Sequence, residues 1–359
     1  MKLGIFGAVA CAALFAGSSF TFAQDDSAAV KASTYPLAAP AGVDSHADKI
    51  APPGAVNKGP FDDKTWIRGH AWDAPPGAKI WNPVKLKLMQ GGKITSVTVN
   101  GNDDPAIYCA AANSGVDFIW TEMQHSGGTW DSVQKMWNAC PHAKAVAGVR
   151  VANANEFDEQ HALDLGAMVL VIPTVRNLEE AKEAVKWAYY PPLGQRSRGS
   201  MTPALRNVPG GYRETANDNI VLILMIETLD GLKDADKIAA LPGVDGIFAA
   251  SGDLGNFSGF KAGDPDYERA INIVHDAALR AHKALCGPYT WVNRPDFTCF
   301  QGPGDSSGAP GPGGDIQSYF TNRSKKLLGP LWNTQGKVEV GPYAAGYVEA
   351  PAKGGGGGE

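Results

Sequence analysis

The sequence carries little charge and no concentrated charge of one sign. Only 19% of its 359 residues are Asp, Glu, Lys or Arg, and the formal net charge is −5. No basic run occurs, which argues against a nucleic-acid partner. No C-x-x-C motif or zinc-type cysteine spacing is present, and the first strand–helix turn lacks the G-x-G-x-x-G pattern of dinucleotide-binding folds. The length allows one large domain or two ordinary ones.

Long apolar runs are also lacking, except at the very start of the chain. Lys2 precedes an apolar run that continues to Ala16, and Ala23 is a small residue suited to a cleavage point. The run is too short to span a bilayer and is typical of a secretory signal peptide over residues 1–23, with a retained membrane anchor as the alternative. We therefore expect the mature protein to be periplasmic or secreted and free of the membrane after signal cleavage.

Cysteines are few. With Cys11 inside the signal peptide, Cys109, Cys140, Cys286 and Cys299 remain. An even number in an oxidising compartment suggests two disulfide bonds, although three pairings are possible and four free thiols are the alternative. Nearness in the sequence favours Cys109–Cys140 and Cys286–Cys299.

The ends of the chain differ in composition from its middle. Residues 24–80 are rich in Ala, Pro, Gly and Asp and have little periodicity. They are interpreted as an irregular N-terminal extension that lies over the core or acts as a spacer from an envelope surface. The region after Cys286 is rich in Gly and Pro, and 331–359 is interpreted as a C-terminal tail. The main domain is expected over 81–330.

Within this domain, short apolar runs alternate with segments of helical spacing, which predicts a parallel sheet. Their number favours a (β/α)8 TIM barrel, with an open doubly wound sheet as the alternative. The predicted strands are 94–99, 116–121, 145–151, 167–172, 220–226, 244–249 and one from 284, and the predicted helices are 83–89, 104–112, 128–139, 155–165, 178–188, 231–240 and 265–283.

Two carboxylates stand where apolar strands give way to turns. Glu227 follows the run 223–226, and Asp253 follows the run 246–249. A carboxylate in such a place is costly unless something pairs with it, so the two are candidate oxygen ligands of one hard cation. The alternative is a helix N-cap for Asp253 and a surface salt bridge for Glu227.

Other polar residues are expected at the same edge of the barrel. Glu122 and His125 follow the second strand, the third strand carries Arg150, and Asp164 precedes Leu165. Active sites of TIM barrels lie at the carboxyl ends of the strands. A single histidine there is more often a capping or core residue, but the combination of His125, Arg150, Asp164, Glu227 and Asp253 favours a site.

Residues from about 81 to 285 resemble the HpcH/HpaI aldolase family of metal-dependent pyruvate aldolases, which have a phosphoenolpyruvate/pyruvate-type TIM barrel. The segments that carry the resemblance are 116–125 (VDFIWTEMQH), 163–173 (LDLGAMVLVIP), 190–196 (YPPLGQR), 226–228 (IET), 242–248 (PGVDGIF) and 252–254 (GDL).

The resemblance implies roles for the candidate residues. Glu227 and Asp253 would hold one divalent cation (Mg²⁺, Mn²⁺ or Co²⁺), and Arg150 would lie near the keto oxygen of the substrate. His125 would be the catalytic base, with Asp164 as its partner and Glu122 as the next candidate. The chain around Ser251, Gly252 and Asp253 would receive the pyruvate carboxylate. Family members are commonly hexamers that exchange a C-terminal helix, here 316–328, so a homo-oligomer (hexamer or trimer) is expected.

The sequence also departs from the family pattern. Glu122-Met-Gln-His125 stands where the family usually has Asp-Gly-Glu-His, and Ala250-Ser-Gly-Asp253 replaces Gly-Pro-Ser-Asp. The function expected from the resemblance is carbon–carbon lyase activity on a 4-hydroxy-2-oxoacid through a pyruvate enolate, with a small oxoacid or aldehyde as substrate. The alternative is a non-catalytic barrel that acts as an exported metal- or carboxylate-binding or envelope-associated protein.

Overall fold

The computed structural model describes residues 57, 60–199, 202, 205–249, 251–304, 308–311 and 313–335. The chain divides into two compact units, Met1–Gly69 and His70–Glu359. In the first unit the side chain of Asn57 donates to the carbonyl of Ile67 and accepts from its N–H, both at 2.7 Å. The predicted signal peptide lies outside the described residues. Among those that are described, no helix has the length and apolar character needed to cross a bilayer.

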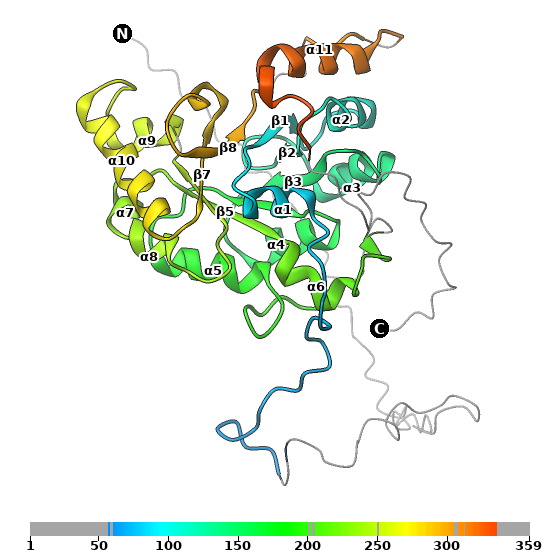
Figure 1. Ribbon diagram of the computed structural model, residues 1–359, viewed down its shortest axis with the longest axis vertical. Coiled ribbons are helices and arrows are strands. Elements are labelled where there is room, and N and C mark those ends of the chain that lie inside the picture. Colours follow the sequence, from blue (N-terminus) through cyan, green and yellow to red (C-terminus); the bar gives the residue numbers. More distant parts are fainter. Residues whose placement is uncertain are drawn as a thin grey trace, which may run out of the picture. The chain divides into compact units, whose positions relative to one another are not determined.

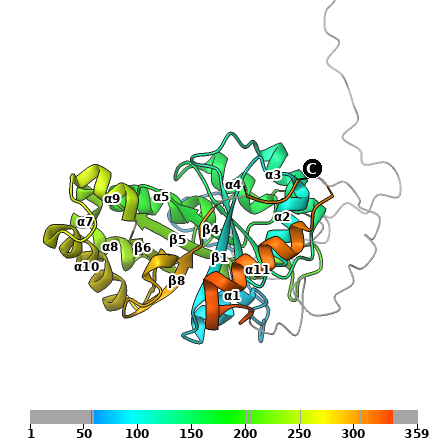
Figure 2. The ribbon, with the colours of Figure 1, turned by 90° about the horizontal axis from the view of Figure 1, so that it is seen from above.

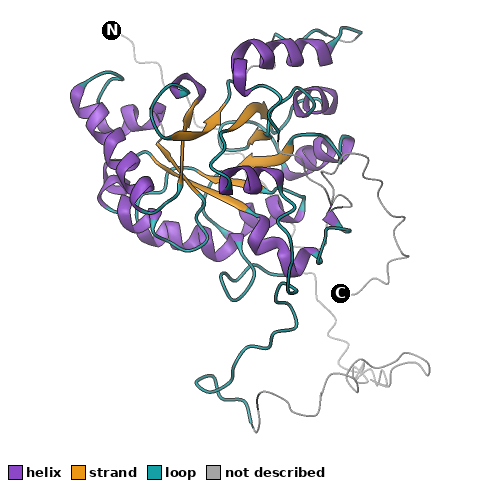
Figure 3. Cartoon of the chain, viewed as in Figure 1, coloured by secondary structure: helices purple, strands orange, loops and turns teal. Residues whose placement is uncertain are grey.

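The second unit is a closed barrel of eight parallel strands in chain order, surrounded by helices (Figures 1 and 3). The (β/α)8 fold expected from the alternating pattern is thereby confirmed. The strands are β1 (Ile94–Asn100), β2 (Phe118–Glu122), β3 (Val146–Arg150), β4 (Val169–Ile172), β5 (Val221–Ile226), β6 (Gly246–Ala249), β7 (Ala284–Pro288) and β8 (Phe297–Gln301).

Helices follow the strands around the barrel. Those described are α1 (Pro83–Met89), α2 (Pro105–Ala112), α3 (Trp130–Ala139), α4 (Glu156–Asp164), α5 (Leu178–Ala188), α6 (Tyr212–Asn219), α7 (Leu229–Lys233), α8 (Ala235–Ala239), α9 (Ser251–Ser258), α10 (Pro265–Arg280) and α11 (Ile316–Leu328).

The helix expected over 231–240 is two short helices, α7 and α8. Asp234 lies between them with φ −105° and ends one helix while beginning the next. Its carboxylate accepts from the backbone N–H of Leu178 at 3.2 Å and from Lys237 at 2.8 Å. A side chain that bonds to local backbone and neighbours in this way competes with a continuous helix.

The eighth strand lies in the region that the sequence shows only as rich in Gly and Pro. In β8, Phe297, Cys299 and Phe300 are buried. The strand closes the barrel by pairing with β7 on one side and with β1 on the other. Strand β5, in contrast, is buried along its whole length, as its continuous apolar run predicts.

A buried asparagine fixes α1 against the start of β5. The side-chain oxygen of Asn219 accepts from the backbone N–H groups of Trp81 and Asn82 at 2.8 and 2.9 Å. The amide of Asn82 donates back to the Asn219 carbonyl at 2.8 Å. Because Asn219 ends α6 two positions before β5 begins, these bonds hold α1 at the amino edge of the barrel, where the strands begin.

The two predicted disulfides have different outcomes. Cys109 of α2 and Cys140 after α3 form a disulfide, with their Cα atoms 5.6 Å apart. Cys286 and Cys299 are buried free thiols. They are register partners on the neighbouring strands β7 and β8. The expected second bridge is nevertheless absent.

Helix α11 packs on α2 of its own chain, and the two helices lie side by side in Figures 1 and 2. The hydroxyls of Ser114, just beyond α2, and Ser324 of α11 are 2.9 Å apart in a buried contact. The indole of Trp332 donates to the carbonyl of Ser114 at 2.8 Å. This helix therefore contributes to the fold of a single chain.

Candidate functional site

Glu122 and Arg150 form an ion pair at the carboxyl edge of the barrel. They are register partners at the ends of β2 and β3. The Arg150 guanidinium reaches Glu122 Oε2 through Nε at 2.7 Å and through Nη2 at 2.5 Å. Oε1 of Glu122 accepts from the backbone N–H groups of Gln124 and His125 at 2.8 and 3.0 Å. Glu122 is thus fully engaged and positions both the arginine and the loop that carries the histidine.

Trp120 lies beneath this ion pair. Its indole N–H donates to Glu122 Oε2 at 3.3 Å, and the Arg150 guanidinium lies 5.7 Å from its ring centroid. Trp120 is fully buried and contacts Phe248 of β6 edge to face. The packed ring limits the guanidinium to few positions, so Arg150 is held in a fixed orientation at the edge of the barrel.

Glu227 follows β5 and is almost completely buried, with 1% of its surface exposed. Its Oε1 accepts from the backbone N–H of Thr174 at 2.6 Å and from the Thr174 hydroxyl at 2.9 Å. Its Oε2 is buried and has no hydrogen-bond partner. Burial raises the pKa of Glu227, the bonds from Thr174 oppose this, and the nearby Asp253 charge raises the pKa further. The site therefore holds one carboxylate oxygen fixed and leaves the other unsatisfied.

Asp253 lies in the first turn of α9, which begins at Ser251, two positions after the end of β6 at Ala249. Gly252 is exposed, and a Cβ atom added there would meet no heavy atom within 4 Å. The open space beside Gly252 and the free N–H groups of a helix start make this segment suitable for an anionic group.

Thr174 and Gln124 belong to this edge, although the sequence analysis did not select them. Thr174 has a φ of 50°, which aims its N–H and hydroxyl at Glu227. The Gln124 amide lies 3.5 Å from the Thr174 hydroxyl, and its Oε1 is buried without a partner. Thr174 could have been found by the rule used for the other residues, since it is the first polar residue after the apolar run of β4.

His125 lies in the loop after β2 and is exposed. Its backbone is tied to Glu122, and its side chain is open to solvent at the carboxyl edge. This placement leaves the imidazole accessible to a substrate at that edge.

Asp164 does not lie at this edge, and the expectation that it would was wrong. It is the last residue of α4, which runs back toward the start of β4, so it lies at the amino edge of the barrel. A Cβ atom added at Gly199 would overlap its carboxylate. Burial raises the pKa of Asp164, while Arg196 and His161 oppose that shift. Within one chain, Asp164 cannot be the partner of His125, since the two residues are at opposite ends.

The candidate metal ligands are two carboxylates. Among the described residues, no group of three or more His, Cys, Asp or Glu side chains is arranged to hold a metal ion. Glu227 and Asp253 lie close enough for their charges to interact, and Glu227 Oε2 is an unsatisfied oxygen. This donor set fits a hard divalent cation that takes its remaining oxygens from water and substrate.

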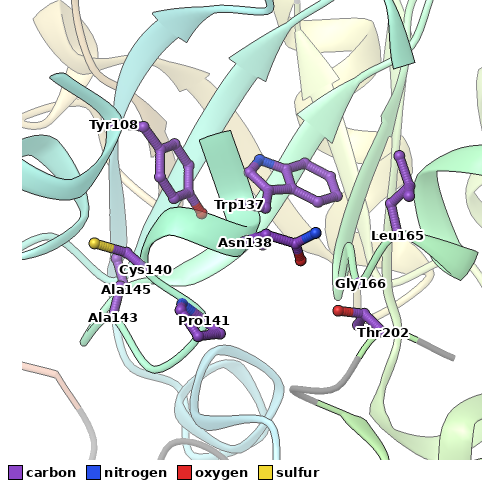
Figure 4. Close-up of a pocket in the computed structure, with 11 residues that line it drawn as sticks. Tyr108, Trp137, Asn138, Cys140, Pro141, Ala143, Ala145, Leu165, Gly166 and Thr202 are labelled. Atoms are coloured by element: carbon purple, nitrogen blue, oxygen red, sulfur yellow. The ribbon is translucent and has the colours of Figure 1, made fainter. Parts of the chain in front are cut away.

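A small hollow at the amino edge is not part of this site (Figure 4). It has a volume of about 30 Å³, which is room for about one water molecule, and it lies between α3 and the loop before β4. Tyr108, Trp137, Cys140, Leu165 and Thr202 are among its lining residues. It is too small for a substrate and lies at the end of the barrel away from Glu227.

Comparison with known proteins identifies the family. The model of the HpcH/HpaI aldolase/citrate lyase family matches residues 99–284, more than half of the chain. The chain belongs to the HpcH/HpaI aldolase/citrate lyase family. The matched region runs from the end of β1 to the start of β7 and includes every candidate residue of the carboxyl edge, whereas β8 and α11 lie outside it.

Relatives within the HpcH/HpaI family are named as aldolases. Over 180 residues the chain is 34% identical to the 2-dehydro-3,6-dideoxy-6-sulfogluconate aldolase of Pseudomonas putida, which covers 50% of this chain and 70% of the relative. It is 31% identical over 180 residues to the hydroxypyruvate/pyruvate aldolase of Paraburkholderia phytofirmans, covering 48% of this chain and 69% of the relative.

A solved structure shows the same fold. The HpcH/HpaI aldolase from Desulfitobacterium hafniense matches with a TM-score of 0.56 and 24% identity, covering 68% of this chain and 96% of that one. At this identity the likeness concerns the fold alone.

Proposed function

We propose that the protein is a divalent-metal-dependent carbon–carbon lyase that cleaves or forms a 4-hydroxy-2-oxoacid. The observation that carries this proposal is the buried Glu227 Oε2, which has no partner and lies near Asp253 and Arg150. A buried carboxylate oxygen without a partner is costly unless a positive charge compensates it. The aldolase names of the relatives support the same class of reaction.

Glu227 and Asp253 would hold the cation, and Mg²⁺, Mn²⁺ and Co²⁺ suit such an oxygen-rich set. When bound, the cation supplies Lewis-acid stabilisation of negative charge on the substrate. The two bonds from Thr174 fix Glu227 Oε1, so that Oε2 is the oxygen left to face the cation.

Arg150 would stabilise the charge that develops on the keto oxygen. Its guanidinium is fixed by Glu122 and by the ring of Trp120 before substrate arrives. Preorganised charge of this kind costs no rearrangement during the reaction. The start of α9 at Ser251, Gly252 and Asp253 would receive the carboxylate of the oxoacid through backbone N–H groups.

His125 would move the proton. In the cleavage direction it takes the proton of the C4 hydroxyl as the C3–C4 bond breaks, and C4 becomes the aldehyde carbon. The electron pair of that bond stays on the three-carbon fragment as an enolate, which accepts a proton at C3 to give pyruvate. The exposed position of His125 on its loop gives it access to a substrate alcohol.

A pairing between His125 and Asp164 would require two copies of the chain. The two residues lie at opposite edges of one barrel, so only a neighbouring copy could bring an Asp164 to a His125. We therefore propose a homo-oligomer, hexamer or trimer, in which sites are shared. We also propose that the protein is exported, which fractionation of cells that produce it would test.

The alternative is a barrel that binds a metal or carboxylate without catalysis. To decide between the two, metal-free protein is incubated with a panel of 4-hydroxy-2-oxoacids, with and without Mg²⁺, Mn²⁺ or Co²⁺, and released pyruvate is measured. Metal-dependent pyruvate release from at least one substrate is the expected result. Metal binding without pyruvate release across the panel would favour the binding protein.

A further inference from the structure

A second cavity opens at the amino edge of the barrel, at the end opposite the candidate active site. It has a volume of about 300 Å³ and lies between α1 and the starts of β6, β7 and β8. Three basic side chains line it, those of Lys85, His282 and Lys283. Asp245 is the acidic side chain in the lining, and Thr298 adds a hydroxyl.

Asp245 is already engaged by groups other than Lys283. Its Oδ1 accepts from Lys85 Nζ at 2.5 Å, and its Oδ2 accepts from the backbone N–H of Leu222 at 3.0 Å. Lys85 also donates to the carbonyl of Ile220 at 3.0 Å. The charges of Lys85 and Asp245 therefore largely cancel each other.

The charge of Lys283, in contrast, is not compensated by an ion pair with any other residue in the described part of the chain. Burial lowers the pKa of Lys283, attraction to Asp245 opposes this, and repulsion from Lys85 adds to the lowering. An ammonium group in this position would be stabilised by an anion placed beside it. His282 also lines the cavity, is exposed and adds a further donor.

We propose that this cavity binds a compact oxyanion, a phosphate or a short carboxylate, through Lys283, with Lys85 and Thr298 as further donors. The volume is at the lower end of the range for ligand pockets, which suits a small molecule. Hydrogen bonds from charged donors to such an anion are about twice as strong as neutral ones. The proposal concerns binding at the amino edge and does not depend on the reaction at the carboxyl edge.

The test uses calorimetric titration of the full-length, metal-free protein with inorganic phosphate and, separately, with succinate. Lys283→Gln removes the charge, and Lys326→Gln removes an equivalent charge from the exposed face of α11. We expect wild type and Lys326→Gln to bind at least one of the anions equally, and Lys283→Gln to bind it at least roughly tenfold more weakly. Lys283→Arg, which keeps the charge, should retain most of the affinity.

A second measurement examines Lys283 directly. Brief labelling with acetic anhydride, followed by peptide mass spectrometry, should modify Lys283 readily in the free protein and less in the presence of the bound anion. Equal affinity of wild type and Lys283→Gln would overturn the proposal. The proposal would also be overturned if neither anion showed saturable binding and neither protected Lys283 from labelling.

Discussion

Thr174 donates both its backbone N–H and its hydroxyl to one oxygen of Glu227, at 2.6 and 2.9 Å. The two residues are 53 positions apart and come from the ends of neighbouring strands, β4 and β5. These bonds orient a buried carboxylate so that its second oxygen remains unsatisfied. In the proposed metal site, the threonine would prepare Glu227 for a cation without being a ligand itself.

Replacement of Thr174 should therefore weaken metal binding. Thr174→Val removes the hydroxyl, and loss of such a supporting bond typically costs about 10- to 100-fold in metal affinity or activity. Thr174→Ser keeps the hydroxyl and is the matched control, which should bind Mn²⁺ nearly as wild type does. Mn²⁺ titration of the three proteins tests this. Equal affinity of the Val and Ser variants would show that the hydroxyl has no part in the site.

His125→Ala should lower turnover by about 10²–10⁴-fold, the usual cost of losing a catalytic base. Metal content and the unfolding temperature should stay nearly unchanged, because the exposed side chain supports little of the fold. Steady-state rates and metal analysis check both statements. Wild-type turnover in this variant would mean that another group moves the proton.

Asp164→Asn should also lower turnover if sites are shared between copies. A mixture of His125→Ala and Asp164→Asn chains, dissociated and reassembled together, should then regain part of the wild-type rate, since some sites combine the intact residue of each chain. No recovery in an oligomer shown to contain both chains would exclude the shared site.

The disulfide between Cys109 and Cys140 should stabilise the fold. The bridged residues are 31 positions apart, and closing a loop of this size contributes about 3–4 kcal/mol in the chain-entropy model. Cys109→Ser should lower the free energy of unfolding by about that amount. Peptide mapping without reduction should show this bridge together with free thiols at Cys286 and Cys299, and a second bridge there would contradict the structure.

Glu159 of α4 is completely buried, and neither of its carboxylate oxygens has a hydrogen-bond partner. Burial raises its pKa well above the ordinary 4.5, and the charges of Asp158 and Glu183 add to the shift. The folded state thus favours the protonated acid. The contribution of the protonated Glu159 to the free energy of unfolding is fully present below pH 4.5. It is lost as the pH rises through the raised pKa.

Glu159→Met should therefore raise the free energy of unfolding by about 1–3 kcal/mol at neutral pH, where the wild-type acid is penalised most. The gain should shrink as the pH falls toward 4.5. Glu156→Met, at an exposed position of the same helix, is the control and should change stability little. Urea unfolding at several pH values measures the difference, and a gain that does not vary with pH would rule out this origin.

Much of the barrel could be predicted from the sequence, because its buried strands are short apolar runs separated by helices. The run before Glu227 matches β5 closely, and the helix expected over 178–188 matches α5. Strand β8 escaped prediction since its flanking sequence is rich in Gly and Pro and hides the strand–helix alternation. Its place is decided by closure of the barrel between β7 and β1, which is a long-range property.

The site was predicted in part for a similar reason. Glu122, Arg150, Glu227 and Asp253 each follow or end an apolar strand, and strand ends on one edge can be recognised locally. Asp164 was misplaced because it ends a helix, and helices return to the amino edge. Whether Cys286 and Cys299 form a disulfide depends on how two buried strands orient the two thiols. Spacing along the chain does not determine that orientation.

The central claim is that Glu227 and Asp253 together hold a divalent cation that an oxoacid helps to bind. Calorimetric titration of Mn²⁺ into wild type, Glu227→Ala, Asp253→Ala and the exposed control Glu179→Ala, each with and without oxalate, tests it most directly. We predict that oxalate tightens Mn²⁺ binding in wild type and in the control, and that either site variant loses at least about 100-fold in affinity. Equal Mn²⁺ binding by wild type and both site variants would contradict the account.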